Sequence, residues 1–130
     1  VLTVNLRLDV LVEDRVIGEE QEGQMECLAG RCSYTVNWQG EMHPCVILTA
    51  PTANVFEVGF KKAWETVSDG CSKIRLYSGC SVCKLKPICR TCAASHLLES
   101  GSYMGKPEYM CTYTETLYEE YKRMKKDFEK

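Results

Sequence analysis

The first residues of the chain alternate between apolar and polar side chains. Residues 2–12 carry leucine or valine at every even position, and the odd positions from 3 to 9 are polar. Successive side chains point to opposite faces of a strand, so this pattern predicts a half-buried β-strand over residues 2–12. Residues 19–26 are acidic and polar and predict a solvated loop.

A β-hairpin is predicted around the tripeptide at residues 38–40. Residues 33–37 and 41–46 flank it and read as the two strands. Gly40 supplies the positive φ angle that a three-residue hairpin loop needs. Residues 49–54 contain a proline and predict a loop after the hairpin.

Two helices are predicted in the middle of the chain. Apolar residues recur at helical spacing over residues 55–67, and Gly70 follows as a stop signal. The cysteine-rich stretch 69–92 fits neither the helical nor the strand period. A short helix is expected over residues 92–99, ending at Gly101.

A third helix is predicted at the C-terminus. Thr112 and Glu115 have the spacing of a capping box, in which each side chain bonds a free backbone N–H at the start of a helix. The apolar residues of this helix share one side: Leu117, Tyr121, Met124 and Phe128. The predicted fold class is therefore α+β, with a β-hairpin, a helix, a loop-rich cysteine region and a C-terminal helix in that order.

Charge and hydropathy exclude several functions. A chain of 130 residues has the length expected of a single domain. A net charge of −2 gives no basic surface for nucleic acid or an anionic membrane. No apolar run approaches the roughly 20 residues that a membrane span needs, and no signal-peptide pattern is present. We therefore expect a cytoplasmic protein without nucleic-acid or membrane partners.

The nine cysteines are the compositional feature that points to chemistry. Disulfides need an oxidising compartment, and an odd count leaves one thiol over. Structural zinc and iron–sulfur clusters both take cysteines in sets of four. Two sets of four and one spare cysteine fit either metal, so the composition favours metal binding over disulfides.

The cysteines fall into two zones. The early zone has three, and the late zone has four in a close run followed by one more. The predicted hairpin brings the ends of the early zone together, and two-residue gaps let one turn present two sulfurs to one site. A four-ligand early site must take one thiol from the late zone. The early zone is Cys27, Cys32 and Cys45, and the late zone is Cys80, Cys83, Cys89, Cys92 and Cys111.

The order of these residues resembles the SPASM domain, an auxiliary iron–sulfur domain of radical-SAM enzymes. CLAGRCSYTVNWQGEMHPC resembles the first half of its pattern, with twelve residues between Cys27 and Gly40 and four between Gly40 and Cys45. CSVCKLKPICRTC followed by Cys111 resembles the second half, although the last gap of the run has two residues instead of three. The resemblance extends over residues 27–115, and the enzymes that carry such a domain include the anaerobic sulfatase-maturating enzymes.

The resemblance implies two [4Fe–4S] clusters, each ligated by its own set of four cysteines. In fully ligated members, the first cluster takes the three early cysteines and the last of the close run. The second takes the rest of the run and the final cysteine. Here the first set is Cys27, Cys32, Cys45 and Cys92, and the second is Cys80, Cys83, Cys89 and Cys111.

The resemblance also implies a radical-SAM barrel elsewhere in the full-length protein. The barrel binds the catalytic iron–sulfur cluster that cleaves S-adenosylmethionine through a C-x3-C-x2-C triplet, which these 130 residues lack. Residues 1–26 are then a lead-in strand and linker from the barrel, residues 27–115 the auxiliary domain, and residues 112–130 the C-terminal helix. The expected role is electron transfer or positioning of a peptide or protein substrate. We expect no catalytic residue in this part.

Several alternatives stay open at this stage. The competing interpretation is a non-catalytic zinc-binding module that binds protein or nucleic acid, in which the same cysteines ligate zinc. His96, four residues after Cys92, is the nearby substitute for that thiol, and His43 is expected to lie at the end of the hairpin. Cys71 matches no position of the pattern and is expected to be a free thiol. Basic residues near the cysteines could stabilise the negative charge of a cluster, namely Arg31, Lys73, Arg75, Lys84, Lys86 and Arg90.

Overall fold

The predicted hairpin is present in the computed structural model, which describes residues 8–129. Strand β1 (Thr35–Val36) pairs antiparallel with β2 (Glu41–His43), with Thr35 opposite His43. Gly40 has a φ of 85°, as expected, and a Cβ added there would lie 2.4 Å from the Phe56 ring. Glycine is therefore needed at this turn for its backbone angle and for the space it leaves.

A third strand was not predicted. Strand β3 (Ala53–Asn54) pairs with the free edge of β2, so residues 49–54 are not all loop. Two residues are too few to show an alternating pattern in the sequence. The strand is defined by its pairing with β2, in which Asn54 lies opposite Glu41. The Asn54 side chain also accepts a hydrogen bond from Phe56 N, which caps the helix that follows.

The helix predicted over residues 55–67 is split and longer than expected. Helix α2 (Val55–Val58) ends at Gly59, whose φ is 81°, and α3 (Phe60–Ser72) begins directly after it. Gly70 lies inside α3, so its interpretation as a stop signal was wrong. A Cβ at Gly70 would lie 2.5 Å from the Pro51 ring, so this glycine allows close packing of the preceding loop on the helix.

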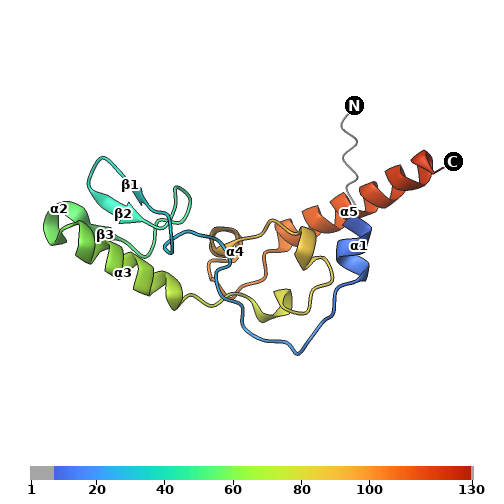
Figure 1. Ribbon diagram of the computed structural model, residues 1–130, viewed down its shortest axis with the longest axis horizontal. Helices are drawn as coiled ribbons and strands as arrows, with labels where there is room; N and C mark the ends of the chain where they lie inside the picture. The colour runs from blue at the N-terminus through green and yellow to red at the C-terminus, as the bar shows by residue number, and fades with distance from the viewer. Residues whose placement is uncertain (1–7, 130) are drawn as a thin grey trace.

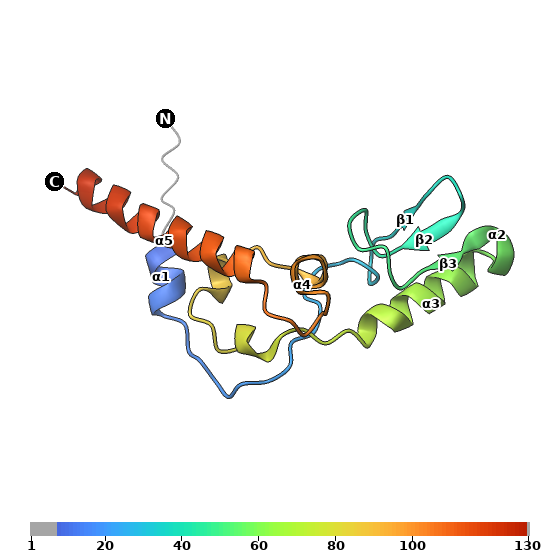
Figure 2. The ribbon, with the colours of Figure 1, turned by 180° about the vertical axis from the view of Figure 1, so that it is seen from behind.

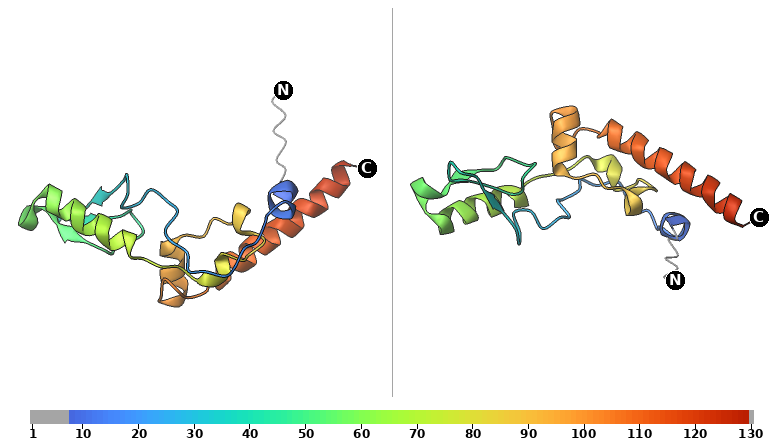
Figure 3. Two further views of the ribbon diagram at one scale, coloured as in Figure 1. Left: turned by 60° about the horizontal axis from the view of Figure 1, so that its bottom comes forward. Right: turned by 90° about the horizontal axis from the view of Figure 1, so that it is seen from above.

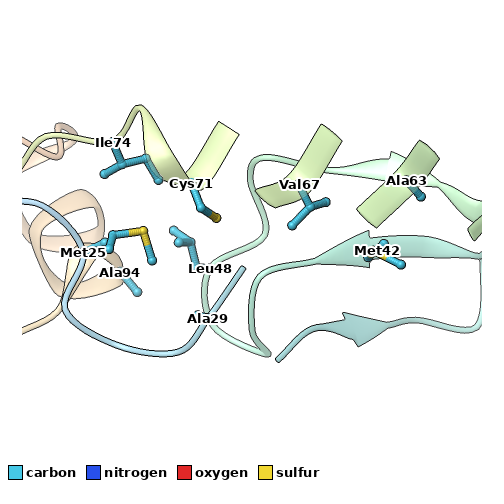
Figure 4. Packing of buried hydrophobic residues seen from close by; sticks show 10 residues of the cluster. Met25, Ala29, Met42, Leu48, Ala63, Val67, Cys71, Ile74 and Ala94 are labelled. Carbon is cyan, nitrogen blue, oxygen red and sulfur yellow. The ribbon is translucent and has the colours of Figure 1, made fainter. Parts of the chain in front are cut away.

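The main core joins α3 to the sheet and to the next helix. Ala63, Val67 and Cys71, at intervals of four residues on α3, are buried. Figure 4 shows these side chains pointing from the helix towards the strand and loops that carry Met42 and Leu48. Helix α4 (Ala93–Ser100) contributes Ala93 and Ala94, and the remaining members are Met25, Ala29 and Ile74.

The cysteine-rich stretch is irregular, as predicted. It contains two short 3₁₀ helices, η1 (Ser78–Cys80) and η2 (Lys86–Ile88). Helix α4 (Ala93–Ser100) follows and ends at Gly101 in the left-handed conformation, with φ of 76°. The helix predicted over residues 92–99 and its glycine stop are confirmed.

The C-terminal helix begins earlier than the capping box indicated. Helix α5 (Glu108–Phe128) starts after Pro107, so Thr112 and Glu115 lie inside it. Proline fixes φ near the helical value and is common at helix starts, and this signal prevails over the capping box. The buried side of α5 carries Thr114 and Tyr118. Three members of the predicted apolar side are exposed: Leu117, Met124 and Phe128.

The strand predicted over residues 2–12 is wrong where the structure describes it. Residues 8–13 form helix α1 (Leu8–Glu13), and residues 2–7 lie outside the described part. Leu8 and Val12, one helical turn apart, pack with Ile88 and Tyr118 in a second, smaller core. Contact with α5 thus decides the conformation of a segment whose alternation fits a strand equally well.

The molecule is elongated, with the two cores at different places along it. In Figure 1 the sheet, α2 and α3 lie at one end, α4 lies near the middle, and α1 crosses α5 at the other end. The opposite view in Figure 2 and the tilted views in Figure 3 show the same order. The architecture is α+β. Within residues 8–129 no helix combines the length and apolar character that crossing a membrane requires.

An ion pair fastens α1 to α5 and gives a pH-dependent prediction. Lys125 Nζ lies 2.5 Å from Asp9 Oδ2, and the Tyr121 hydroxyl donates to Asp9 Oδ1 over 2.9 Å. The hydrogen bond from Lys125 is the main cause that lowers the pKa of Asp9 from 3.8 to about 2. A carboxyl group whose pKa is lowered by folding stabilises the folded protein fully at pH values above its pKa in the unfolded state. This stabilisation is lost as the pH falls through the pKa of the folded state.

The Asp9→Asn protein is therefore expected to unfold at lower urea concentration than the wild type at neutral pH. The difference in midpoint should shrink as the pH falls from 3.8 towards about 2. Urea titrations across this range, with Asp14→Asn as the control at a neighbouring acid, measure it. A midpoint difference that stays the same at all pH values would contradict the role of the ion pair.

Candidate metal centre

The late cysteines are presented by tight turns and by the start of a helix. Cys80 ends η1, and Cys83 follows in a turn in which its N–H donates to the Cys80 carbonyl over 3.3 Å. Cys89 follows η2, with its N–H donating to Leu85 O over 3.0 Å. Cys111 lies in the first turn of α5. Short turns that free their side chains suit thiols that bind one metal group.

These four late thiols line one cavity, and burial and charge act on two of them. Burial is the main cause that raises the pKa of Cys80 to about 11, and charge on Cys111, Cys83 and Cys89 raises it further. Burial also raises the pKa of Cys111, where Lys106 opposes the shift and Cys89 and Cys83 add to it. Both shifts favour the protonated form of Cys80 and Cys111. A metal group would supply positive charge that opposes these shifts, because ligation requires the thiolate form.

A cavity of about 270 Å³ lies in front of the four cysteines, and all of them line it. Cys27, Cys92 and His96 line the same cavity. The donor chemistry and the space therefore fit an iron–sulfur cluster held by Cys80, Cys83, Cys89 and Cys111.

Two further residues support this group, and neither was singled out from the sequence. Thr114, buried one turn after Cys111, has its hydroxyl 3.4 Å from Cys89 Sγ and 2.7 Å from Met110 O. Lys106 lines the cavity and acts on Cys111. The signal for Thr114 was its position three residues after Cys111, on the same face of α5.

Three of the six predicted basic residues differ in what they contact. Lys86 lines the cavity and lowers the pKa of Cys80, while its ammonium pairs with Glu26 over 2.6 Å. Lys73 instead pairs with Asp69 over 2.6 Å, and Arg75 donates to backbone carbonyls. Lys86 is therefore the candidate for stabilising negative charge at the late cysteines.

The early cysteines lie on loops around the main core. The Leu28 carbonyl accepts from three successive amides, those of residues 31–33, which makes a tight turn between Cys27 and Cys32. Cys45 follows β2, and Leu48 N donates to its sulfur over 3.2 Å. An amide hydrogen bond of this kind stabilises a thiolate.

The structure brings only part of the predicted first set together. Cys92 precedes α4 and packs, like Cys45, against the main core. Cys27 and Cys92 both line the cavity of the late cysteines, whereas Cys45 and Cys32 are outside its lining. Cys32 is exposed. Within residues 8–129, no three His, Cys, Asp or Glu side chains are gathered closely enough to hold one metal ion.

Cys71 lies among the early cysteines although it has no place in the pattern. Burial raises its pKa to about 11, and charge on Cys27 and Cys45 adds to the shift. A Cβ added to Gly30 would lie 2.3 Å from Cys71 Sγ, so the turn after Cys27 packs directly on this sulfur. Its thiol is free and buried. Its spacing from Ala63 and Val67 on α3 was the signal for a core position.

The two histidines differ in burial. His43 lies at the end of β2, as expected, with its Nε2 3.8 Å from Glu41 Oε2. His96 is completely buried on α4, and its Nδ1 lies 2.9 Å from the Gly105 carbonyl oxygen.

Comparison of the chain with protein-family models, with curated proteins and with solved structures finds no match.

Proposed function

We propose that residues 27–115 are an auxiliary SPASM-type domain that holds two [4Fe–4S] clusters. The domain would serve a radical-SAM enzyme that modifies a peptide or protein, with S-adenosylmethionine bound by a separate barrel of the full-length chain. The observation that carries the proposal is the grouping of Cys80, Cys83, Cys89 and Cys111 around one cavity. These four are separated by up to 31 positions in the sequence, counted from Cys80 to Cys111.

The first cluster of the proposal takes Cys27, Cys32, Cys45 and Cys92. Cys27 and Cys92 support a site next to the second cluster, because both line the same cavity as the late cysteines. When bound, such clusters accept and donate single electrons. The chain's own part is to hold the thiolates, to keep the cavity wall largely apolar, and to place Lys86 and Lys106 near the negative charge.

The proposed role of the domain is electron transfer or the positioning of a peptide or protein substrate. The exposed aromatic residues at the hairpin end, Trp38 and Phe56, lie away from the cysteine cavity and are not among its lining. They offer no chemistry of their own. The proposal therefore assigns no catalytic residue to residues 8–129 and places the reaction in the barrel.

Anaerobic reconstitution tests the proposal. The protein is expected to bind about eight irons and about eight sulfides per chain, because each [4Fe–4S] cluster holds four of each. The visible absorption should be the broad band of these clusters, with a paramagnetic signal after reduction. A preparation that takes two zinc ions tightly and refuses iron would support the zinc module instead and sink the proposal.

A further inference from the structure

The segment that joins α1 to the first early cysteine, residues 14–26, is irregular and lies against the cysteine-rich stretch. Figure 1 shows it in blue, running from α1 past the yellow part of the chain that carries the late cysteines. Gly23 and Leu76 exchange two backbone hydrogen bonds, of 2.8 Å and 3.4 Å. Contacts with residues 76–86 therefore fix the path of this segment.

The turn between Cys80 and Cys83 is held from outside by the same segment. Arg15 Nη2 donates to the Ser81 carbonyl over 2.7 Å, and Gln21 N donates to the Ser81 hydroxyl over 3.0 Å. Ser81 lies between the two cysteines and lines the cavity with them. Its carbonyl and its hydroxyl are thus both bonded to residues that lie 60 or more positions earlier in the chain.

Further contacts hold the two short 3₁₀ helices of the late cysteine run. The Ser78 hydroxyl donates to Glu20 Oε1 over 2.5 Å at the start of η1. Lys86 of η2 pairs with Glu26 over 2.6 Å, and α1 packs against η2 in the smaller core. The chain before the early cysteines therefore supports both η1 and η2.

Arg15 reaches the site through the backbone of the turn. It is not among the residues that line the cavity, and its hydrogen bond goes to a peptide carbonyl between two candidate ligands. A hydrogen bond from a charged donor is roughly twice as strong as a neutral one. Arg15 Nε is buried without a hydrogen-bond partner, which is unfavourable, so the stability of the segment alone does not explain an arginine here.

We propose that Arg15 is a positioning residue of the second cluster, holding the turn between Cys80 and Cys83 in the shape that ligation needs. The inference rests on the proposed function, because both cysteines belong to its second set. A turn that is already held loses less freedom when its thiolates bind a metal group. By reciprocity, a cluster bound to the turn also holds the contacting segment in place.

Iron release to a chelator, followed anaerobically in the reconstituted protein, tests the role of Arg15. In Arg15→Gln, about four of the eight irons should leave about tenfold faster than in the wild type, and the others at the wild-type rate. Arg15→Lys should restore the wild-type rate, because an ammonium group also donates to the Ser81 carbonyl. Arg123→Gln is the matched control, since Arg123 is exposed on α5 and pairs with Glu120 of the same helix.

Two results would overturn the inference and leave the two clusters standing. One is iron release from Arg15→Gln at the wild-type rate. The other is faster loss of all the irons, or no recovery in Arg15→Lys, because either would make Arg15 a general stabiliser of the fold. A wild-type chain that binds no iron overturns both proposals.

Hydrogen exchange in the wild-type protein gives a second readout that decides the matter even where Arg15→Gln fails to fold. The Gln21 amide, which donates to Ser81, should exchange about tenfold more slowly with the clusters bound than without them. The Ala63 amide, which donates to Gly59 O at the start of α3, is the control and should change little. Equal protection of the Gln21 amide in both states contradicts the coupling between this segment and the cluster.

Discussion

The Cys111→Ala protein is expected to bind about four irons where the wild type binds about eight. Cys111 is the member of the second set that comes from α5, and its charge acts on Cys80 across the cavity. Removing it leaves three thiols, one short of a full set. Iron and sulfide analysis after anaerobic reconstitution measures the loss, and the signal of the other cluster should remain.

Cys71→Ala is the matched control for this substitution. Burial raises the pKa of both Cys71 and Cys111, so both are thiols that titrate above their ordinary value. Cys71 belongs to the main core, and shortening its side chain should cost about 1 kcal/mol of unfolding free energy. It should leave the iron count at about eight. Equal iron losses in both variants would contradict the assignment of the second set.

The sequence predicted those elements whose signals are local. The hairpin turn needs a positive φ at Gly40, and α4 ends at a left-handed Gly101; both requirements are met within a few residues. Segments defined by distant contacts were not predicted. The residues of α1 fit a strand by alternation and form a helix because Val12 packs on Tyr118 of α5. Tertiary contact overrides a short periodic pattern in this way.

The candidate site was predicted unevenly for the same reason. The spacing of the cysteines grouped Cys80, Cys83, Cys89 and Cys92, since turns bring such neighbours together, and only the family resemblance assigned Cys92 to the other set. The burial of Cys71 beneath Gly30 depends on how a loop packs on α3, which spacing does not reveal. The hydrogen bond from Arg15 to Ser81 depends likewise on a contact between residues that are 66 positions apart.

Removal of the metal is expected to unfold the cysteine-rich stretch while the hairpin end stays folded. Residues 77–92 contain two 3₁₀ turns and a single buried apolar residue, Ile88, so little apolar burial supports them. Ligation of a structural metal can contribute on the order of 10 kcal/mol to folding, far more than this burial. The sheet and α3 share a core of buried apolar side chains that includes Met42, Ala63 and Val67, and we expect this core to persist without the metal.

Hydrogen exchange with and without a chelator measures this difference. In the reconstituted protein, the amides of Cys83, Ile88 and Cys89 should exchange slowly, because they donate to carbonyls in η1 or at the start of η2. After chelation their protection should fall at least 100-fold, because a loss of about 2.7 kcal/mol already has that effect. Amides of α3 on the buried side should change by less than about tenfold. Uniform loss of protection along the whole chain would mean that the metal holds both ends together, and no loss would mean that residues 77–92 fold without it.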